Sequence, residues 1–178
     1  TIFTYKYDST PPTFTYNSPA AGGDSSWYSQ DPGSPINIDL IWGSASPLIN
    51  FNYQIGAGGW NSIWSGSQSS DYTTEWALTW ASLAEGSNEI SISGQDRAGN
   101  GATDTYAAGV RGFVLRKDIS APDNPASPAS AWDTSAKATV LASGSTYDYQ
   151  HPYFEWTAPS DNPVAANAGV GYYYVGFS

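Results

Sequence analysis

Alternation of apolar and polar positions recurs along most of the chain and predicts β-strands. At 36–42, Ile36, Ile38 and Leu40 alternate with polar residues, which is the period-two pattern of a half-buried strand. The same period appears in runs at 14–16, 48–55, 76–80, 90–95 and 110–117. No stretch between 8 and 118 sustains the 3.6-residue period of an amphipathic helix. The pattern therefore predicts an all-β fold.

Turn residues mark the boundaries between these runs. Glycines at 56, 58 and 59 favour a hairpin, and Asp-Arg-Ala-Gly-Asn at 96–100 predicts a tight turn. The alternation at 48–55 predicts that the odd-numbered side chains, from Ile49 to Ile55, face the core. Polar loops are expected at 17–35, 65–70 and 101–109.

A repeated linker divides the chain into modules. Lys-Tyr-Asp-Ser-Thr-Pro-Pro at 6–12 is echoed by Arg-Lys-Asp-Ile-Ser-Ala-Pro at 116–122, and the two copies lie a domain length apart. In both copies an apolar strand ends at a basic residue, followed by Asp, a hydroxyl residue and Pro, which stops the strand ladder. We therefore expect 1–7 to be the last strand of a preceding module, 8–118 a complete module, and 119–178 the N-terminal part of a second one.

The second module repeats the pattern of the first. Its first apolar strands are predicted at 152–156 and 171–177, after which the sequence stops in mid-module. A half-formed sandwich would leave an apolar face and a strand edge in water. We expect the missing strands to come from a longer chain or, as the alternative, from an adjacent subunit.

The order of short motifs resembles that of a known family. Along the complete module come a strand ending in Trp42, an aromatic strand at 51–53, Gly-Gly-Trp at 58–60, Leu-x-Glu-Gly-x-Asn at 83–88 and Asp-x-Ala-Gly-Asn at 96–100. This order resembles the bacterial Ig-like repeats of large surface and secreted proteins. The second module looks like the related fibronectin-III-like units. The resemblance implies tandem Ig-like antiparallel β-sandwiches with Greek-key connections.

The charge of the chain excludes several partners. A net charge of −10 argues against nucleic acid and anionic membrane surfaces, which both require clustered Lys and Arg. No apolar run is long enough to cross a bilayer within these residues. The chain has no Cys, so it holds neither disulfides nor a thiolate site. Acidity of this kind suits an extracellular or cell-surface protein and favours divalent cations.

Four aspartates are candidate calcium ligands. Asp96 at a module end could join Asp8 or Asp118, together with Asp104, as hard oxygen ligands around Ca²⁺. The alternative is a local turn, in which the Asp96 carboxylate accepts backbone N–H groups and Asn100 caps the loop. The local turn is the favoured interpretation, because the chain contains no Asp-x-Asp-x-Asp-Gly loop. No other cofactor is indicated.

Aromatic residues in or beside loops are candidate sugar-binding platforms. Trp60, Trp64, Trp27 and Tyr28 could stack on the faces of sugar rings if they form an exposed row. The alternative, which we favour, is that these rings plug the ends of an aromatic-rich sandwich.

Catalytic machinery is not indicated. His151 is the only His and precedes Pro152, so it is a poor base for a Ser or Thr nucleophile. Glu75 and Glu155 fall on outward strand positions, where they cannot form the paired carboxylates of a glycosidase. We expect a non-catalytic structural or adhesive repeat of a prokaryotic cell-surface protein, in a stalk, adhesin or filament. Its expected partners are neighbouring modules, with a glycan or another surface ligand as a further candidate. The alternative function is a carbohydrate-binding accessory module of a secreted enzyme.

Overall fold

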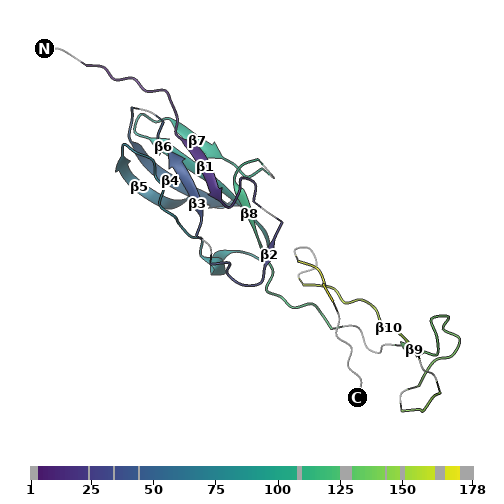
Figure 1. The fold of residues 1–178 in the computed structure, drawn as a ribbon. Coiled ribbons are helices and arrows are strands. Elements are labelled where there is room, and N and C mark those ends of the chain that lie inside the picture. The colour runs from purple at the N-terminus through teal and green to yellow at the C-terminus, as the bar shows by residue number, and fades with distance from the viewer. Residues whose placement is uncertain are drawn as a thin grey trace. The chain divides into compact units, whose positions relative to one another are not determined.

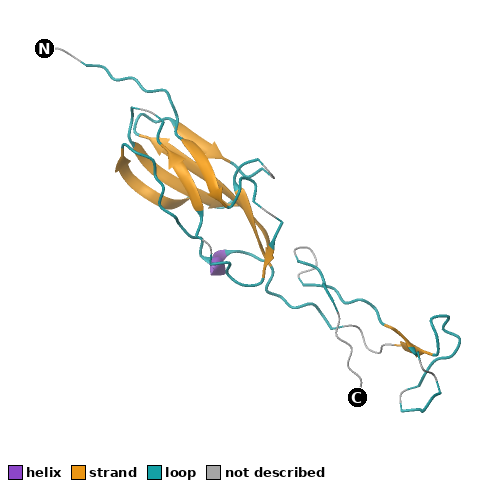
Figure 2. Ribbon diagram, in the orientation of Figure 1, coloured by secondary structure: helices purple, strands orange, loops and turns teal. Residues whose placement is uncertain are grey.

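The computed structural model describes residues 4–23, 25–33, 35–43, 45–107, 110–124, 130–142, 144–148, 151–162 and 167–172. Backbone contacts divide the chain into two units, Thr1–Ile119 and Ser120–Ser178. The described residues form strands, turns and a single 3-10 helix, η1 (Trp80–Ser82), as Figure 2 shows. The prediction of an all-β fold is confirmed.

A small sheet forms one side of the first unit. β1 (Thr13–Ser18) pairs antiparallel with β3 (Asn37–Ile41), so that Phe14 lies opposite Leu40. On its other edge, β3 is extended by isolated bridges from Ile36 to Trp76 and from Leu40 to Tyr72. The chain at 72–76 therefore borders β3 without forming a regular strand.

A larger, six-stranded sheet forms the other side (Figure 1). Its strand order is β2–β8–β6–β4–β5, and β7 also pairs with β6. The strands are β2 (Trp27–Tyr28), β4 (Leu48–Ile55), β5 (Asn61–Gln68), β6 (Gly86–Asp96), β7 (Gly101–Asp104) and β8 (Phe113–Lys117). Every pairing is antiparallel except that of β2 with β8, which is parallel.

The core lies between the two sheets. Ile38 and Leu40 of the small sheet belong to the same buried cluster as Phe51, Ile92 and other residues of the large sheet. Aromatic rings join the layers, with Phe14 stacked 5.9 Å from Phe51. Burial of this apolar surface is the main stabilising term of such a sandwich.

The strand predictions at 36–42, 48–55 and 90–95 are confirmed by β3, β4 and β6. The predicted facing of 48–55 is wrong at its start. Leu48 is fully buried while Ile49 is not part of the core, because the register shifts between Leu48 and Asn50. Such a β-bulge changes which side chain points inward.

Three further predictions need correction. The run 76–80 is not a strand, because after the bridge at Trp76 the chain turns into η1. The expected loop at 65–70 continues β5 instead, since Gln68 still pairs with Leu48. The expected insertion at 101–109 begins with strand β7, which pairs with β6.

The predicted strand at 1–7 is not formed over its described part. Residues 4–7 lie outside every strand, and Tyr5 is 86% exposed. Residues 1–3 lie outside the described residues. Its role as the last strand of a preceding module stays a prediction, because that pairing would need the preceding module.

The second unit contains a short antiparallel pair, β9 (Ser130–Trp132) with β10 (Tyr153–Glu155). Lys137 and Glu155, both in this unit, form an ion pair. The strand predicted at 152–156 is confirmed by β10. The strand predicted at 171–177 lies outside the described residues from 173 onwards, and Gly171 and Tyr172 form no strand.

Candidate functional site

A cavity of about 560 Å³ opens at the end of the first unit where β1 finishes and β2 begins. Its size falls within the range of roughly 300–1,000 Å³ that is usual for small-ligand sites. The walls come from the loop after β1, from η1 and its flanks, and from β8. They consist of Asn17, Ser18, Pro19, Ala20, Tyr28, Asp31, Pro32, Gly33, Pro35, Ile36, Ala77, Leu78, Trp80, Leu83 and Leu115.

The segment after β1 lies against β8 at Gly22 and Gly23. The Gly22 amide donates to the Gly112 carbonyl at 2.6 Å. Gly23 has a φ of 70°, and a Cβ there would lie 2.6 Å from the Val114 amide nitrogen. Only glycine combines this backbone angle with so close an approach. The wall of the cavity is therefore anchored to the large sheet.

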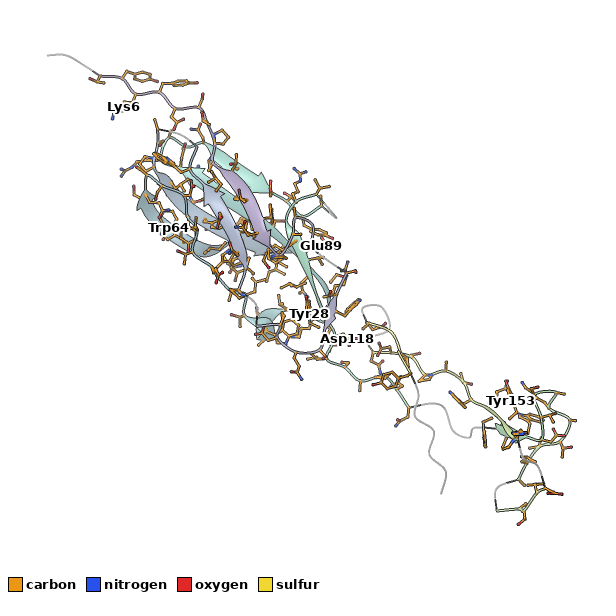
Figure 3. The ribbon with its side chains drawn as sticks, viewed as in Figure 1. Lys6, Tyr28, Trp64, Glu89, Asp118 and Tyr153 are labelled. Atoms are coloured by element: carbon orange, nitrogen blue, oxygen red, sulfur yellow. The ribbon has the colours of Figure 1, made fainter. Side chains whose placement is uncertain are left out.

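Tyr28, the second residue of β2, lines the cavity. The strand pairs with β8 so that Tyr28 lies opposite Lys117, and the Asp118 amide donates to the Tyr28 carbonyl at 3.0 Å. Figure 3 shows Tyr28 and Asp118 at the same end of the unit. The backbone of Tyr28 is thus held against the end of β8.

Trp80 is held by a buried lysine. The Lys117 ammonium donates to the Trp80 carbonyl at 3.2 Å and to the Leu83 carbonyl at 2.9 Å. It also lies 5.1 Å from the centre of the Trp80 ring, within the distance of a cation–π contact. A buried charge is tolerated because the carbonyls and the ring take the place of water. The lysine therefore fixes both the turn and the ring.

A strip of amides and carboxylates leads away from the cavity across the small sheet. Asn17 donates from Nδ2 to Asn37 Oδ1 and to Asp39 Oδ2, both at 2.9 Å. Asn37 in turn donates to Glu75 Oε1 at 3.3 Å. The register of β1 and β3 shifts between Tyr16 and Ser18, and such a bulge re-aims the side chain it carries. Asn17 belongs to both the strip and the cavity wall.

The four aromatic residues proposed from the sequence do not form one row. Tyr28 lines the cavity and Trp27 is its neighbour on β2. Trp60 lies at the β4–β5 hairpin with 46% of its surface exposed. Trp64 packs on Tyr72 with ring centres 5.4 Å apart, at the margin of the core. Trp64 therefore packs on the core from within β5, whereas Tyr28 lines the cavity.

Two of the proposed calcium ligands share one partner. Asn100 donates from Nδ2 to Asp96 Oδ2 at 2.9 Å and to the Asp8 carbonyl at 3.2 Å. The backbone amide of Asn100 also donates to Asp96 Oδ1 at 2.9 Å. Asp8 accepts from the amides of Thr10 and Ser46 at 3.0 and 2.9 Å. These contacts have the form expected for the local turn.

The other two proposed ligands lie elsewhere. Asp104 on β7 accepts from the Tyr16 hydroxyl at 3.0 Å. Asp118 follows Lys117, which pairs with the first residue of β6, whereas Asp96 is the last residue of that strand. The two ends of β6, and with them Asp118 and Asp96, are roughly 30 Å apart at the usual rise per residue of a strand. Over the described residues, no three His, Cys, Asp or Glu side chains gather in a metal-binding group.

His151 is exposed and lies in the second unit, two residues before β10. The described residues that line the cavity include no histidine, lysine or arginine. No helix in the described part of the chain is long and apolar enough to span a bilayer.

Comparison with protein-family models, with curated proteins and with solved structures gave no match.

The sequence predicts a loop at 17–35, but β1 runs to Ser18 and strand β2 forms at Trp27–Tyr28 within that range. The sequence also misses most of the residues that line the cavity. The alternation at 76–80 places Trp80 in a strand, and the sequence indicates no role for Asn17 or Asp31 beyond the polar range 17–35 that contains them. The available signal was the group of prolines at 19, 32 and 35, which stiffen the loop enough to form a wall. The contribution of Lys117 and Leu115 depends on the folding of distant segments.

Proposed function

We propose that this chain is a non-catalytic structural or adhesive segment of a prokaryotic cell-surface protein, built from Ig-like modules. The proposal rests chiefly on how the chain enters and leaves the first unit. The segment before β1 is tied down at one end of β6, and the segment after β8 at the other end.

At the entry, Asp8 is bonded to three other parts of the chain. Its carboxylate accepts the amides of Thr10 and Ser46, and its carbonyl accepts the Asn100 side chain. Asn100 closes the turn that follows β6. A pull on the preceding segment would therefore act on the body of the sandwich.

At the exit, the residues after β8 are bonded in a corresponding way. The Asp118 amide donates to the Tyr28 carbonyl at 3.0 Å, and the Ile119 amide donates to Glu85 Oε1 at 3.2 Å. The chain thus enters the first unit at one end of β6 and leaves it at the other end. This geometry suits a spacer in a tandem array, in which each module extends the protein by its own length.

The strand order also supports the Ig-like assignment. The large sheet contains the order β8–β6–β4–β5, which corresponds to strands G, F, C and C′ of a variable-type Ig sandwich. β1, β3 and the bridged segment at 72–76 would then correspond to A, B and E. The second unit would be a further module of the same class.

Surface labelling of the source cells tests the location. An antibody raised against the 178-residue chain should label intact cells as strongly as permeabilised ones. Labelling that requires permeabilisation would refute a cell-surface role.

Pulling experiments test the structural role. When the first unit is held at residues 4 and 119 and pulled, it should unfold in one step. Its unfolding force should be well above the unfolding force of the Asp8→Ala variant. The variant loses the two carboxylate bonds at the entry but keeps the core. Equal unfolding forces for both proteins would show that the entry contacts do not resist the pulling force.

A further inference from the structure

We propose that the cavity at the end of β1 is a binding site for a neutral carbohydrate. The site shares Tyr28 with the exit contacts, in which only the Tyr28 backbone carbonyl takes part, and this proposal does not depend on the structural role proposed above. Of the four aromatic residues that the sequence offers as candidates for sugar stacking, Tyr28 is the one that lines this cavity.

The cavity offers the two kinds of surface that a sugar requires. Tyr28 and Trp80 supply aromatic rings, and the C–H face of a pyranose packs on such rings. Asn17, Ser18 and Asp31 supply polar side chains at the same cavity. Their remaining hydrogen-bonding capacity is available to the hydroxyls of a ligand.

The strip of amides and carboxylates extends the polar part of the site. Asn17 connects the cavity to Asn37 and Asp39, and Asn37 continues to Glu75. Amide groups both donate and accept hydrogen bonds and carboxylates accept them, which suits the neighbouring hydroxyls of a sugar. An oligosaccharide with one residue in the cavity could continue along this strip.

Charge decides between neutral and acidic ligands. Among the described residues no Lys or Arg lines the cavity, whereas Asp31 does. Asp39 and Glu75 add negative charge along the strip. The Lys117 ammonium is turned onto two carbonyls and the Trp80 ring. Phosphate, sulfate and uronate groups would therefore be repelled, while uncharged hydroxyls would not.

The binding surface is formed before any ligand arrives. Gly22 and Gly23 press the loop onto β8, the Asp118 amide fixes Tyr28, and Lys117 fixes Trp80. A preformed site loses less conformational entropy on binding than a flexible loop would. Lys117 is a positioning residue here, since it holds the ring and does not line the cavity.

Binding is tested with the complete 178-residue chain on an array of neutral, sialylated and sulfated glycans. Glycans that bind are then titrated by calorimetry. We expect a neutral glycan to bind. Trp80→Ala should raise its Kd by about tenfold or more, the change that corresponds to ~1.4 kcal/mol.

Two further variants locate the site independently of Trp80. Ala77→Trp places a large ring at the exposed wall of the cavity and should abolish binding without removing a core side chain. Trp60→Ala alters the exposed ring on the hairpin, outside the cavity, and should leave the Kd within about twofold of the wild-type value. Melting temperatures show that each variant is folded.

Several results would overturn the proposal. One is the absence of any neutral glycan binding at millimolar concentration; another is selective binding of acidic glycans or of peptides. Loss of binding in Trp60→Ala with retention in Ala77→Trp would place the site on the hairpin. None of these results bears on the surface labelling or on the pulling experiment, so the structural role would stand.

Discussion

The hydroxyl of Tyr16 on β1 donates a hydrogen bond to the Asp104 carboxylate on β7, at 3.0 Å. The same hydroxyl accepts the Gly112 amide at 2.8 Å. Tyr16 belongs to the small sheet and Asp104 to the large one, so a single side chain joins the two layers. Asp104 thereby has a structural role that its assignment as a calcium ligand did not foresee.

Replacing Tyr16 by Phe should destabilise the first unit. The change removes the hydroxyl while the Gly112 amide and the Asp104 carboxylate remain partly buried without it. We expect the free energy of unfolding to fall by about 1–3 kcal/mol. Chemical denaturation measures this value, and Tyr5→Phe at an 86% exposed position is the matched control. Equal effects of the two substitutions would contradict the role of this contact.

The same contact should make stability fall at high pH. Burial, and then the nearby Asp104 carboxylate, raise the pKa of Tyr16 above its ordinary value, although the Gly112 amide acts in the opposite direction. Above about pH 10 the unfolded tyrosine loses its proton while the folded one keeps it. The contribution of Tyr16 is therefore fully present below that pH and is lost as the pH rises further.

Unfolding curves between pH 9 and 11.5 measure this dependence. The loss of stability over that range should be smaller in Tyr16→Phe than in the wild-type protein. Identical pH profiles for the two proteins would show that other groups cause the change.

The turn after β6 should be stable without metal. Both carboxylate oxygens of Asp96, which is fully buried, already accept N–H groups of Asn100. Those donors occupy the positions that a cation would need. We expect excess chelator to leave the melting temperature unchanged; a lower melting temperature in chelator would support calcium binding instead.

Asp96→Ala should lower the free energy of unfolding by about 1–3 kcal/mol, because two N–H donors lose their acceptor. Glu89→Ala serves as the control, since Glu89 is exposed on the same strand. Differential scanning calorimetry of both variants, with and without chelator, separates the turn from any effect of metal. A similar small change in both variants would argue against the turn.

How far the sequence predicts this structure depends on whether a feature is local. Alternation identified β3, β4 and β6, because each strand has one buried face. It failed at 76–80, where the same spacing of large residues serves a core contact at Trp76 and a turn at Trp80. It also failed at Ile49, since a bulge is set by the pairing of two strands and leaves no trace in one of them.

The candidate site was less predictable than the fold. The Asp96 turn could be foreseen, because its donors and acceptor lie within five residues. The cavity could not, because Asn17, Trp80 and Leu115 are far apart in the chain and meet only in the folded unit. Lys117 looked like the end of a linker, and its contact with Trp80 appears only when β8 is placed beside η1.

The tightness of the sandwich can be tested at Gly94 on β6. A Cβ at this position would lie 2.4 Å from Leu40 Cδ1, and Leu40 is fully buried in the facing sheet. Gly94→Ala should therefore force the two sheets apart or push Leu40 out of its rotamer, at a cost of about 1–3 kcal/mol. Gly59→Ala is the matched control, since a Cβ at Gly59 meets nothing within 4 Å. Urea unfolding of both variants gives the difference in stability.

The double variant Gly94→Ala with Leu40→Val tests whether crowding between the two residues causes this difference. If crowding is responsible, the smaller Val should recover part of the stability lost in Gly94→Ala, although Leu40→Val alone is destabilising. Strictly additive losses in the double variant would show that Gly94 and Leu40 do not press on each other.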